Sequence, residues 1–414
     1  HCIPPGNFWT GTPMRFVGRE AAAAGALLLG MDLAIAQHKH GAGSGKDSYP
    51  HIDSELEIKL QPDWNYRSTY RPNKKTEFNS EVEALVGLHV TKELSLNVHG
   101  KFERVKNNDR DFSFLGGNGA FIEEFYVKYE RERFGLQLGK QNLESFGRAW
   151  AEHPGIFHKE FAEEYKLSEA VGLSGFYRLI DDVDLGRHKV TGAWFFLDNT
   201  SLTNSIFSRP VSGGFLTERP RQTHYRDGGP GNTRWPASYL VTLDGGQPDL
   251  LPGLSYNLGY AFLKRGTSRV SERSTNEHRG VVSVAYDFAI AKDLTFTPLV
   301  EWVRIKNADF DDTDPVTGAP VFGRTDFYTA SGLLKWQGWA AMAGVTLRNN
   351  KQPSEVGAVT RDKLYFASLE YSFEFGLTVG VGWKQDRQPI AIDQAGAFGR
   401  TSTLGAIAYY VLEF

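Results

Sequence analysis

Apolar residues recur at every second position in many separate segments of this chain. Leu254, Tyr256, Leu258 and Tyr260, for example, are separated by smaller or polar residues. Successive side chains of a β-strand point to opposite faces, so a period of two predicts a strand with one apolar face. About sixteen such segments occur, at 52–60, 82–90, 94–98, 121–129, 134–138, 171–177, 190–196, 235–243, 254–262, 282–288, 294–302, 328–336, 339–347, 365–373, 377–383 and 403–414.

The intervals between these segments alternate in length. Tight turns are predicted at 91–93, 131–133, 291–293, 337–338 and 375–376. Long polar loops separate them, at 61–80, 105–120, 143–167, 199–234, 264–277, 306–324, 348–362 and 385–401. This alternation predicts an up-and-down barrel with short turns at one end and long loops at the other. The intervals 180–189 and 244–253 are longer than the other turns, which leaves eighteen strands as the alternative count.

Composition supports an all-β fold. The mean hydropathy is -0.38, 44 of the 414 residues are Gly, and aromatic residues reach 13%. No apolar stretch approaches the ~20 residues of a membrane helix. In a transmembrane barrel, lipid-facing and lumen-facing residues alternate and cancel in any hydropathy window. We therefore predict a transmembrane antiparallel β-barrel, with a soluble sandwich or propeller as the alternative. The net charge of -3 lacks the excess of positive charge that is typical of a nucleic-acid-binding protein.

The N-terminal residues have the pattern of a secretory signal. Arg15 and Arg19 precede a short apolar run at 21–31, and small residues at Ala34 and Ala36 form a cleavage site before Gln37. We therefore assign 1–36 to an upstream extension plus a cleaved signal peptide, 37–50 to a flexible leader and 51–414 to the barrel. The only cysteine, Cys2, lies in the discarded piece. The mature chain would thus contain no disulfide and no cysteine ligand or nucleophile.

The last strand ends on Phe414, and together with the signal peptide, strand pattern and loops it resembles the Gram-negative outer-membrane porins. In that family the terminal aromatic belongs to the signal that the barrel-assembly machinery recognises. The stretch 121–147 also resembles the hairpin before the constriction loop of several porin and exporter families. Alginate-export barrels, which have eighteen strands, share this hairpin and are the nearest alternative.

The resemblance implies that the loop at 143–167, after the fifth strand, folds into the barrel and narrows a pore. Aromatic and aliphatic residues at Phe157, Phe161, Tyr165 and Leu167 have helical spacing and can pack on the inner wall. The acidic residues predicted to line the pore are Glu152, Glu160, Glu163 and Glu164. A solvated extracellular loop with an amphipathic helix is the alternative.

Opposite an acidic loop we expect basic residues on the wall. Alternate residues of a strand face the same side, and we call this alternation strand parity. It directs Lys128 and Arg178 into the lumen, and we assign both to the constriction. The same parity turns four further residues inward: Lys101, Lys189, Lys335 and Lys384. Such a transverse field would orient polar solutes and order ions.

No sequence motif supports catalysis, a cofactor or a metal. Gly117-Asn118-Gly119 lacks the strand–helix context of a dinucleotide site, and the acidic run at 309–314 lacks the Gly and Glu of a calcium loop. We therefore predict a non-enzymatic outer-membrane channel for small hydrophilic solutes or ions. A barrel dedicated to one substrate, such as a polysaccharide or chelated metal, stays open. The expected partners are outer-membrane lipid and lipopolysaccharide, the assembly machinery, the solutes and, as one candidate assembly, a homotrimer.

Overall fold

The computed structural model describes residues 48–69, 71–105, 115, 117–152, 155–205, 225, 228–266, 275–313, 320–351, 359–389 and 398–414. The predicted signal peptide and almost all of the predicted leader lie outside these residues, so both assignments stay predictions. Within the described chain, no helix has the length and apolar character needed to cross a membrane.

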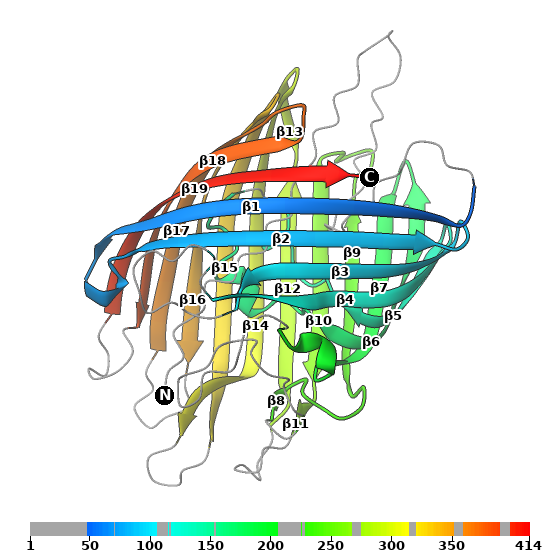
Figure 1. Ribbon diagram of the computed structural model, residues 1–414, viewed down its shortest axis with the longest axis horizontal. Helices are drawn as coiled ribbons and strands as arrows, with labels where there is room; N and C mark the ends of the chain where they lie inside the picture. Colours follow the sequence, from blue (N-terminus) through cyan, green and yellow to red (C-terminus); the bar gives the residue numbers. More distant parts are fainter. Residues whose placement is uncertain are drawn as a thin grey trace.

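One antiparallel sheet closes on itself to form the molecule (Figure 1). Each strand pairs with the next along the chain, and the first strand, β1, pairs with the last, β19. The segments β12 and β13 lie end to end beside β14 and make one barrel strand, which gives sixteen in all. The strands are β1 (His51–Ser68), β2 (Thr76–His89), β3 (Leu94–Arg104), β4 (Asn118–Glu130), β5 (Phe134–Gln141), β6 (Ala170–Asp182), β7 (Gly186–Leu197), β9 (Ser238–Gly246), β10 (Leu254–Leu263), β12 (Glu277–Tyr286), β13 (Phe288–Ala291), β14 (Leu294–Thr313), β15 (Pro320–Trp336), β16 (Trp339–Lys351), β17 (Val359–Ser372), β18 (Leu377–Pro389) and β19 (Phe398–Glu413).

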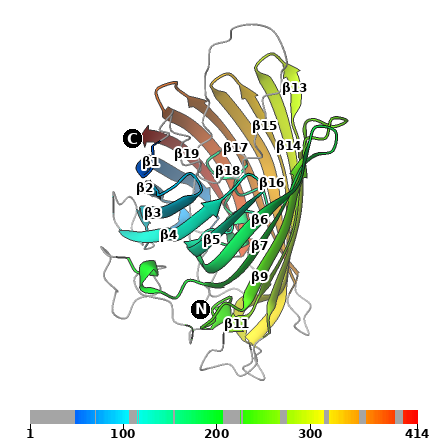
Figure 2. The same ribbon diagram turned by 90° about the vertical axis from the view of Figure 1, so that its right-hand side faces the viewer.

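Short elements decorate the loops. A two-residue ladder joins β8 (Gly229–Pro230) to β11 (Arg265–Gly266). Three 3₁₀ turns occur among the described residues, η1 (Arg71–Asn73), η2 (Ala162–Glu164) and η3 (Ser201–Thr203). Figure 2 shows how the sheet curves round so that its first and last strands meet.

The predicted barrel and its sixteen strands are confirmed, but several predicted loops are wrong in extent. β1 continues to Ser68, and β14 and β15 occupy most of the predicted loop at 306–324. The reason is visible in β1, where the polar residues Gln61, Asp63 and Asn65 continue the inward-facing row. The outward row also continues past Pro62 to Trp64, which is 54% exposed, so the strand extends beyond the point where the predicted apolar period stopped.

The two faces of the sheet differ in polarity. On β1, Glu57 and Lys59 point inward and are 2% and 3% exposed, whereas Ile58 and Leu60 point outward and are 38% and 41% exposed. This alternation places apolar side chains on the outside of the barrel, where lipid would cover them.

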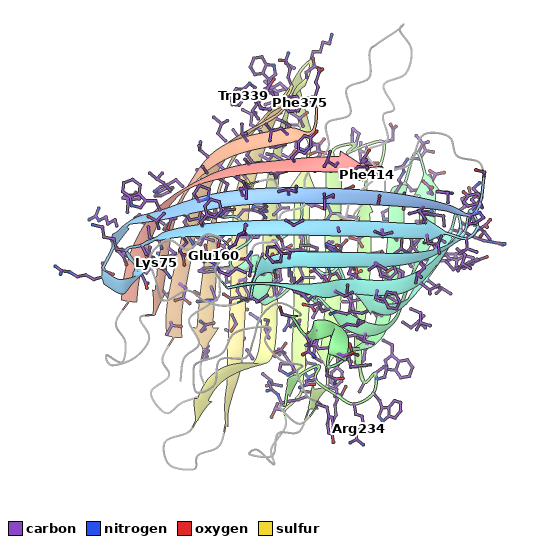
Figure 3. All side chains as sticks on the ribbon, viewed as in Figure 1. Lys75, Glu160, Arg234, Trp339, Phe375 and Phe414 are labelled. Carbon is purple, nitrogen blue, oxygen red and sulfur yellow. The ribbon has the colours of Figure 1, made fainter. Side chains whose placement is uncertain are left out.

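As predicted, one end of the barrel has short turns and the other has long loops. Trp339, Phe375 and Phe414 lie toward the end with short turns, whereas Lys75 and Arg234 lie toward the end with long loops (Figure 3). Aromatic rings cluster near the short turns, with 4.8 Å between the centroids of Trp339 and Tyr371. Such rings form the interfacial girdle of a membrane barrel.

Candidate pore constriction

The segment between β5 and β6 enters the barrel and packs on its inner wall. Its large side chains Phe146, Phe157, Phe161 and Tyr165 are 0–1% exposed. They join one apolar cluster with inward residues of strands across the barrel, among them Leu240, Val281, Val303, Phe327, Leu333, Met342, Leu364, Phe366 and Ile407. The barrel interior therefore contains a hydrophobic core that forms only because this segment is inside.

Glycines on the last strands make room for the segment. A Cβ atom at Gly405 on β19 would lie 2.7 Å from the Phe157 ring, and one at Gly382 on β18 would lie 3.1 Å from Ile156. A side chain at Gly405 would therefore force a shift, and one at Gly382 would press on Ile156 more tightly than ordinary packing allows.

The two stems of the segment are clamped together beside β4. Lys140 Nζ lies 2.8 Å from carboxylate oxygens of both Glu169 and Asp198. The Asn142 amide donates to Glu124, and its side-chain oxygen accepts from the Glu169 amide at 2.9 Å. This arrangement directs the chain between the stems into the lumen.

A buried carboxylate on β14 anchors the middle of the segment. Glu301 is 1% exposed and accepts from the amides of Arg148 and Ala149, at 2.5 and 3.1 Å. It also accepts from the hydroxyls of Ser283 and Tyr165. Sequence analysis missed Glu301. Its inward parity within the apolar segment 294–302 was available as a signal, but its partners lie far away in sequence.

The four glutamates predicted to line the pore all lie on this segment and each forms an ion pair. Glu160 bonds to Lys384 on β18 at 2.6 Å, and Glu164 pairs with Arg348 on β16. The other two pair within the segment, Glu152 with Arg148 and Glu163 with Lys166. Two glutamates therefore tie the segment to the wall, and two balance its own cations.

Lys128 and Arg178 lie away from these contacts. Both approach Glu130, near the short turns, with N–O distances of 2.6 and 3.5 Å. Three wall cations meet the segment among the described residues. Lys384 was predicted to point inward, whereas Arg348 was not. The third is Arg279 on β12, which donates to the Tyr165 carbonyl at 2.8 Å. The predicted strand ended at 347, so Arg348 was assigned to a loop.

The wall formed by β1–β4 is acidic, which corrects the expectation of a basic wall. Lys101 points inward as predicted, but Glu81, Glu83 and Glu123 surround it at 2.8, 3.0 and 3.3 Å. We name these charges the lumen cluster, which has six carboxylates against two lysines and one histidine: Glu57, Lys59, Glu81, Glu83, His99, Lys101, Glu103, Glu123 and Glu124. Strand parity turns acidic and basic residues inward alike. The prediction considered only the lysines, and so gave the wrong sign for the charge of this part of the wall.

Two of the titratable groups of the segment have pKa values shifted to near neutral pH. Burial raises the pKa of Glu152 to about 7, against the opposing effect of Arg148, and Glu301 and Asp244 raise it further. Burial also lowers the pKa of Lys159 to about 8. Both groups therefore change charge close to neutral pH.

The local structure of the segment differs from the helix expected for 157–167. Turns occupy 158–161, and the only regular piece is the 3₁₀ turn η2. Among the described residues, no group of three or more His, Cys, Asp or Glu side chains is arranged to hold a metal ion.

Solved structures with the same architecture are outer-membrane proteins. The outer membrane channel DcaP of Acinetobacter baumannii matches with a TM-score of 0.54 and 10% identity, over 89% of this chain and 99% of that one. The trimer form of OmpT from Vibrio cholerae matches with a TM-score of 0.52 and 11% identity, over 88% of this chain and 100% of that one. The fold is that of an outer-membrane β-barrel. No protein-family model and no curated protein sequence matches the chain, so the likeness is one of fold.

Proposed function

We propose that this protein is a non-enzymatic outer-membrane channel for small hydrophilic solutes or ions, constricted by the segment 142–169. A barrel of about sixteen strands is too wide for its wall side chains to fill, so an aqueous path remains unless a loop narrows it. The observation that supports this proposal best is the segment held across the lumen by Glu301 and by the pairs Glu160–Lys384 and Glu164–Arg348.

The charges inside the barrel support a preference for cations. The lumen cluster carries an excess of carboxylates, and Lys159 on the segment loses its charge near pH 8. A passage with low-dielectric walls and an excess of one charge concentrates ions of the opposite charge. We therefore expect potassium to pass more readily than chloride.

A barrel dedicated to one solute is the second candidate. The burial of the lumen cluster favours it. The side chains of Lys101 and Glu83 are only 1% and 3% exposed, which leaves little open space beside them. A narrow, charged passage selects solutes by size and charge more strongly than a wide one. Solute-induced block of single-channel current would distinguish the two candidates.

The assembly state and export route are further parts of the proposal. We expect a homotrimer, in line with the trimer form of the Vibrio cholerae structure. Insertion would require the barrel-assembly machinery, with Phe414 as part of its signal.

The test replaces Glu152, Glu160, Glu163 and Glu164 together by Gln and measures reversal potentials in planar bilayers. At 0.1 M KCl and pH 8 the variant should shift toward anions, because the negative charge of these carboxylates leaves the constriction. The shift should shrink at 1 M KCl, since the Debye length falls from ~10 Å to ~3 Å.

The matched control is Glu374→Gln, which removes a carboxylate from an exposed short turn. It should leave the reversal potential unchanged. An unchanged reversal potential in the quadruple variant at low salt would place the constriction elsewhere. Failure of the wild-type protein to conduct would reject the channel itself.

A further inference from the structure

A small polar cavity opens on the outside of the barrel at its long-loop end. Arg67, Ser68 and Thr69 at the end of β1 line it together with Gln385 on β18 and with Arg400 and Ser402 on β19. The cavity has a volume of about 190 Å³. It lies at the seam where the first and last strands pair.

Strand register shows that the arginines face outward. Ser402 lies opposite Arg67, and Arg400 and Leu404 share its face of β19. Leu404 is 45% exposed on the outward surface, so Arg400 faces the same way. A register shift between Asn65 and Arg67 turns the arginine out of the inward row that Asn65 belongs to.

The cavity is held in shape by hydrogen bonds between the three strands. The Arg400 amide donates to the Thr69 hydroxyl at 2.8 Å, and the Thr69 amide donates to the Arg400 carbonyl at 3.0 Å. Gln385 donates to the Ser402 hydroxyl at 3.3 Å. Among the described residues, neither Arg67 nor Arg400 forms an ion pair, and both are exposed.

Further cations extend the same outward face. Arg387 lies opposite Arg400, and Lys363 lies opposite Arg387 on the next strand. The carboxylates between them, Asp362 and Asp386, alternate to the inner face, where Asp362 pairs with Arg348 and Asp386 accepts from the Thr401 amide. Arg387 still acts electrostatically on Asp362, so the outward positive charge rests mainly on Arg67 and Arg400.

Aromatic residues lie directly beside these cations, on the side toward the barrel middle. Trp383 donates to the Tyr66 hydroxyl at 3.2 Å, and Trp64 and Tyr365 are 54% and 40% exposed on the same face. Outward aromatic rings mark the level of the lipid headgroups. At ~3.3 Å per strand residue, cations one or two positions further on reach the level of headgroup phosphates.

We propose that this cavity binds a phosphate group of an outer-leaflet glycolipid. The planar guanidinium groups of Arg67 and Arg400 suit bidentate contacts with phosphate oxygens, and Ser402 and Gln385 add polar partners. A lipid fits better than free phosphate, because exposed Trp64 and Leu404 lie beside the cavity, where acyl chains would cover them. The site is independent of conduction through the lumen.

The test measures binding of diphosphoryl lipid A to the refolded protein in detergent by native mass spectrometry. The Arg67→Gln/Arg400→Gln variant should bind at least tenfold more weakly than the wild type. The control Lys92→Gln/Lys292→Gln, which removes two cations from exposed short turns, should bind like the wild type. Dephosphorylated lipid A should bind weakly to all three proteins.

Two results would overturn the proposal. One is equal binding of diphosphoryl lipid A by the Gln variant and the wild type. The other is displacement of the lipid by millimolar inorganic phosphate, which would indicate a free-ion site. If the Gln variant does not refold, the Arg67→Lys/Arg400→Lys variant tests the proposal instead. It keeps the charge without the guanidinium fork and should bind at least threefold more weakly, and wild-type binding by this variant would reject the site.

Discussion

Glu301 organises the constriction at the scale of single residues. Its carboxylate is buried on β14 and receives two backbone amides and two hydroxyls, from Arg148, Ala149, Ser283 and Tyr165. A buried carboxylate is stable only when its oxygens are hydrogen-bonded, and here the donors come mainly from the segment inside the barrel. Glu301 therefore positions the constriction rather than lining it.

We predict that Glu301→Ala loosens the constriction. Each buried donor left without an acceptor costs about 1–3 kcal/mol, so the segment should leave the wall for part of the time. The measurement is single-channel current, which should become larger and noisier than in the wild type. Glu301→Gln keeps one carbonyl acceptor and should show a smaller change. Identical current traces for all three proteins would contradict this role.

Ion selectivity should depend on pH through Glu152. Its pKa is raised to about 7, so it is neutral below that pH and negative above it. The lowered pKa of Lys159, about 8, removes a positive charge as the pH rises further. Both changes make the segment more negative, so cation selectivity should increase from pH 6 to pH 9. In Glu152→Gln the part of the increase near pH 7 should be smaller than in the wild type. A wild-type reversal potential that is constant over this range would contradict both assignments.

At the scale of elements, the segment 142–169 and the barrel should be separable. The pairing of β5 with β6 runs from Phe134–Tyr177 to Gln141–Ala170 and involves only strand residues. We predict that replacing 148–166 by a short Gly-Ser linker leaves the barrel closed and increases conductance several-fold. Heat-modifiable migration on gels checks closure, and bilayer recording checks conductance. An unfolded variant would show that the segment is needed for the barrel itself.

The barrel could be predicted from the sequence because each strand can be recognised from its own alternating pattern. Outward residues such as Leu254, Tyr256 and Leu258 repeat at the period of a strand, whatever the rest of the chain does. The contacts of the constriction have no such local signal. Arg348 lies beyond the apolar part of β16, and its pairing with Glu164 depends on how far the segment reaches across the lumen. Strand parity predicts which face of the sheet a residue lies on. It does not predict the position of the residue along the barrel axis or the residue that it contacts across the lumen.

At the scale of the whole molecule, the first and last strands, β1 and β19, hold the barrel closed. The Phe414 amide donates to the Ser54 carbonyl at 2.9 Å, whereas its ring is 74% exposed. The ring therefore contributes little to packing within the barrel. We predict that Phe414→Ala lowers the amount of barrel inserted in cells but leaves the thermal unfolding of the refolded protein nearly unchanged.

The measurements for Phe414→Ala are outer-membrane abundance and unfolding of the detergent-refolded protein. Val411→Ala, near the same chain end, serves as the control and should not reduce insertion in the same way. Equal abundance of Phe414→Ala and wild type would show that the terminal ring is not part of the assembly signal.

The seating of Phe157 against Gly405 and of Ile156 against Gly382 has a consequence for the order of folding. These glycines lie on the last two strands to be synthesised, whereas the segment that covers them comes from the first half of the chain. The segment cannot reach its final place until β18 and β19 have arrived, and once β1 and β19 are joined the wall encloses it. The segment must therefore dock before or while the ring closes, and contacts so distant in sequence make that step slow. Substitutions at the constriction should then change the yield of folded protein as well as the current it conducts.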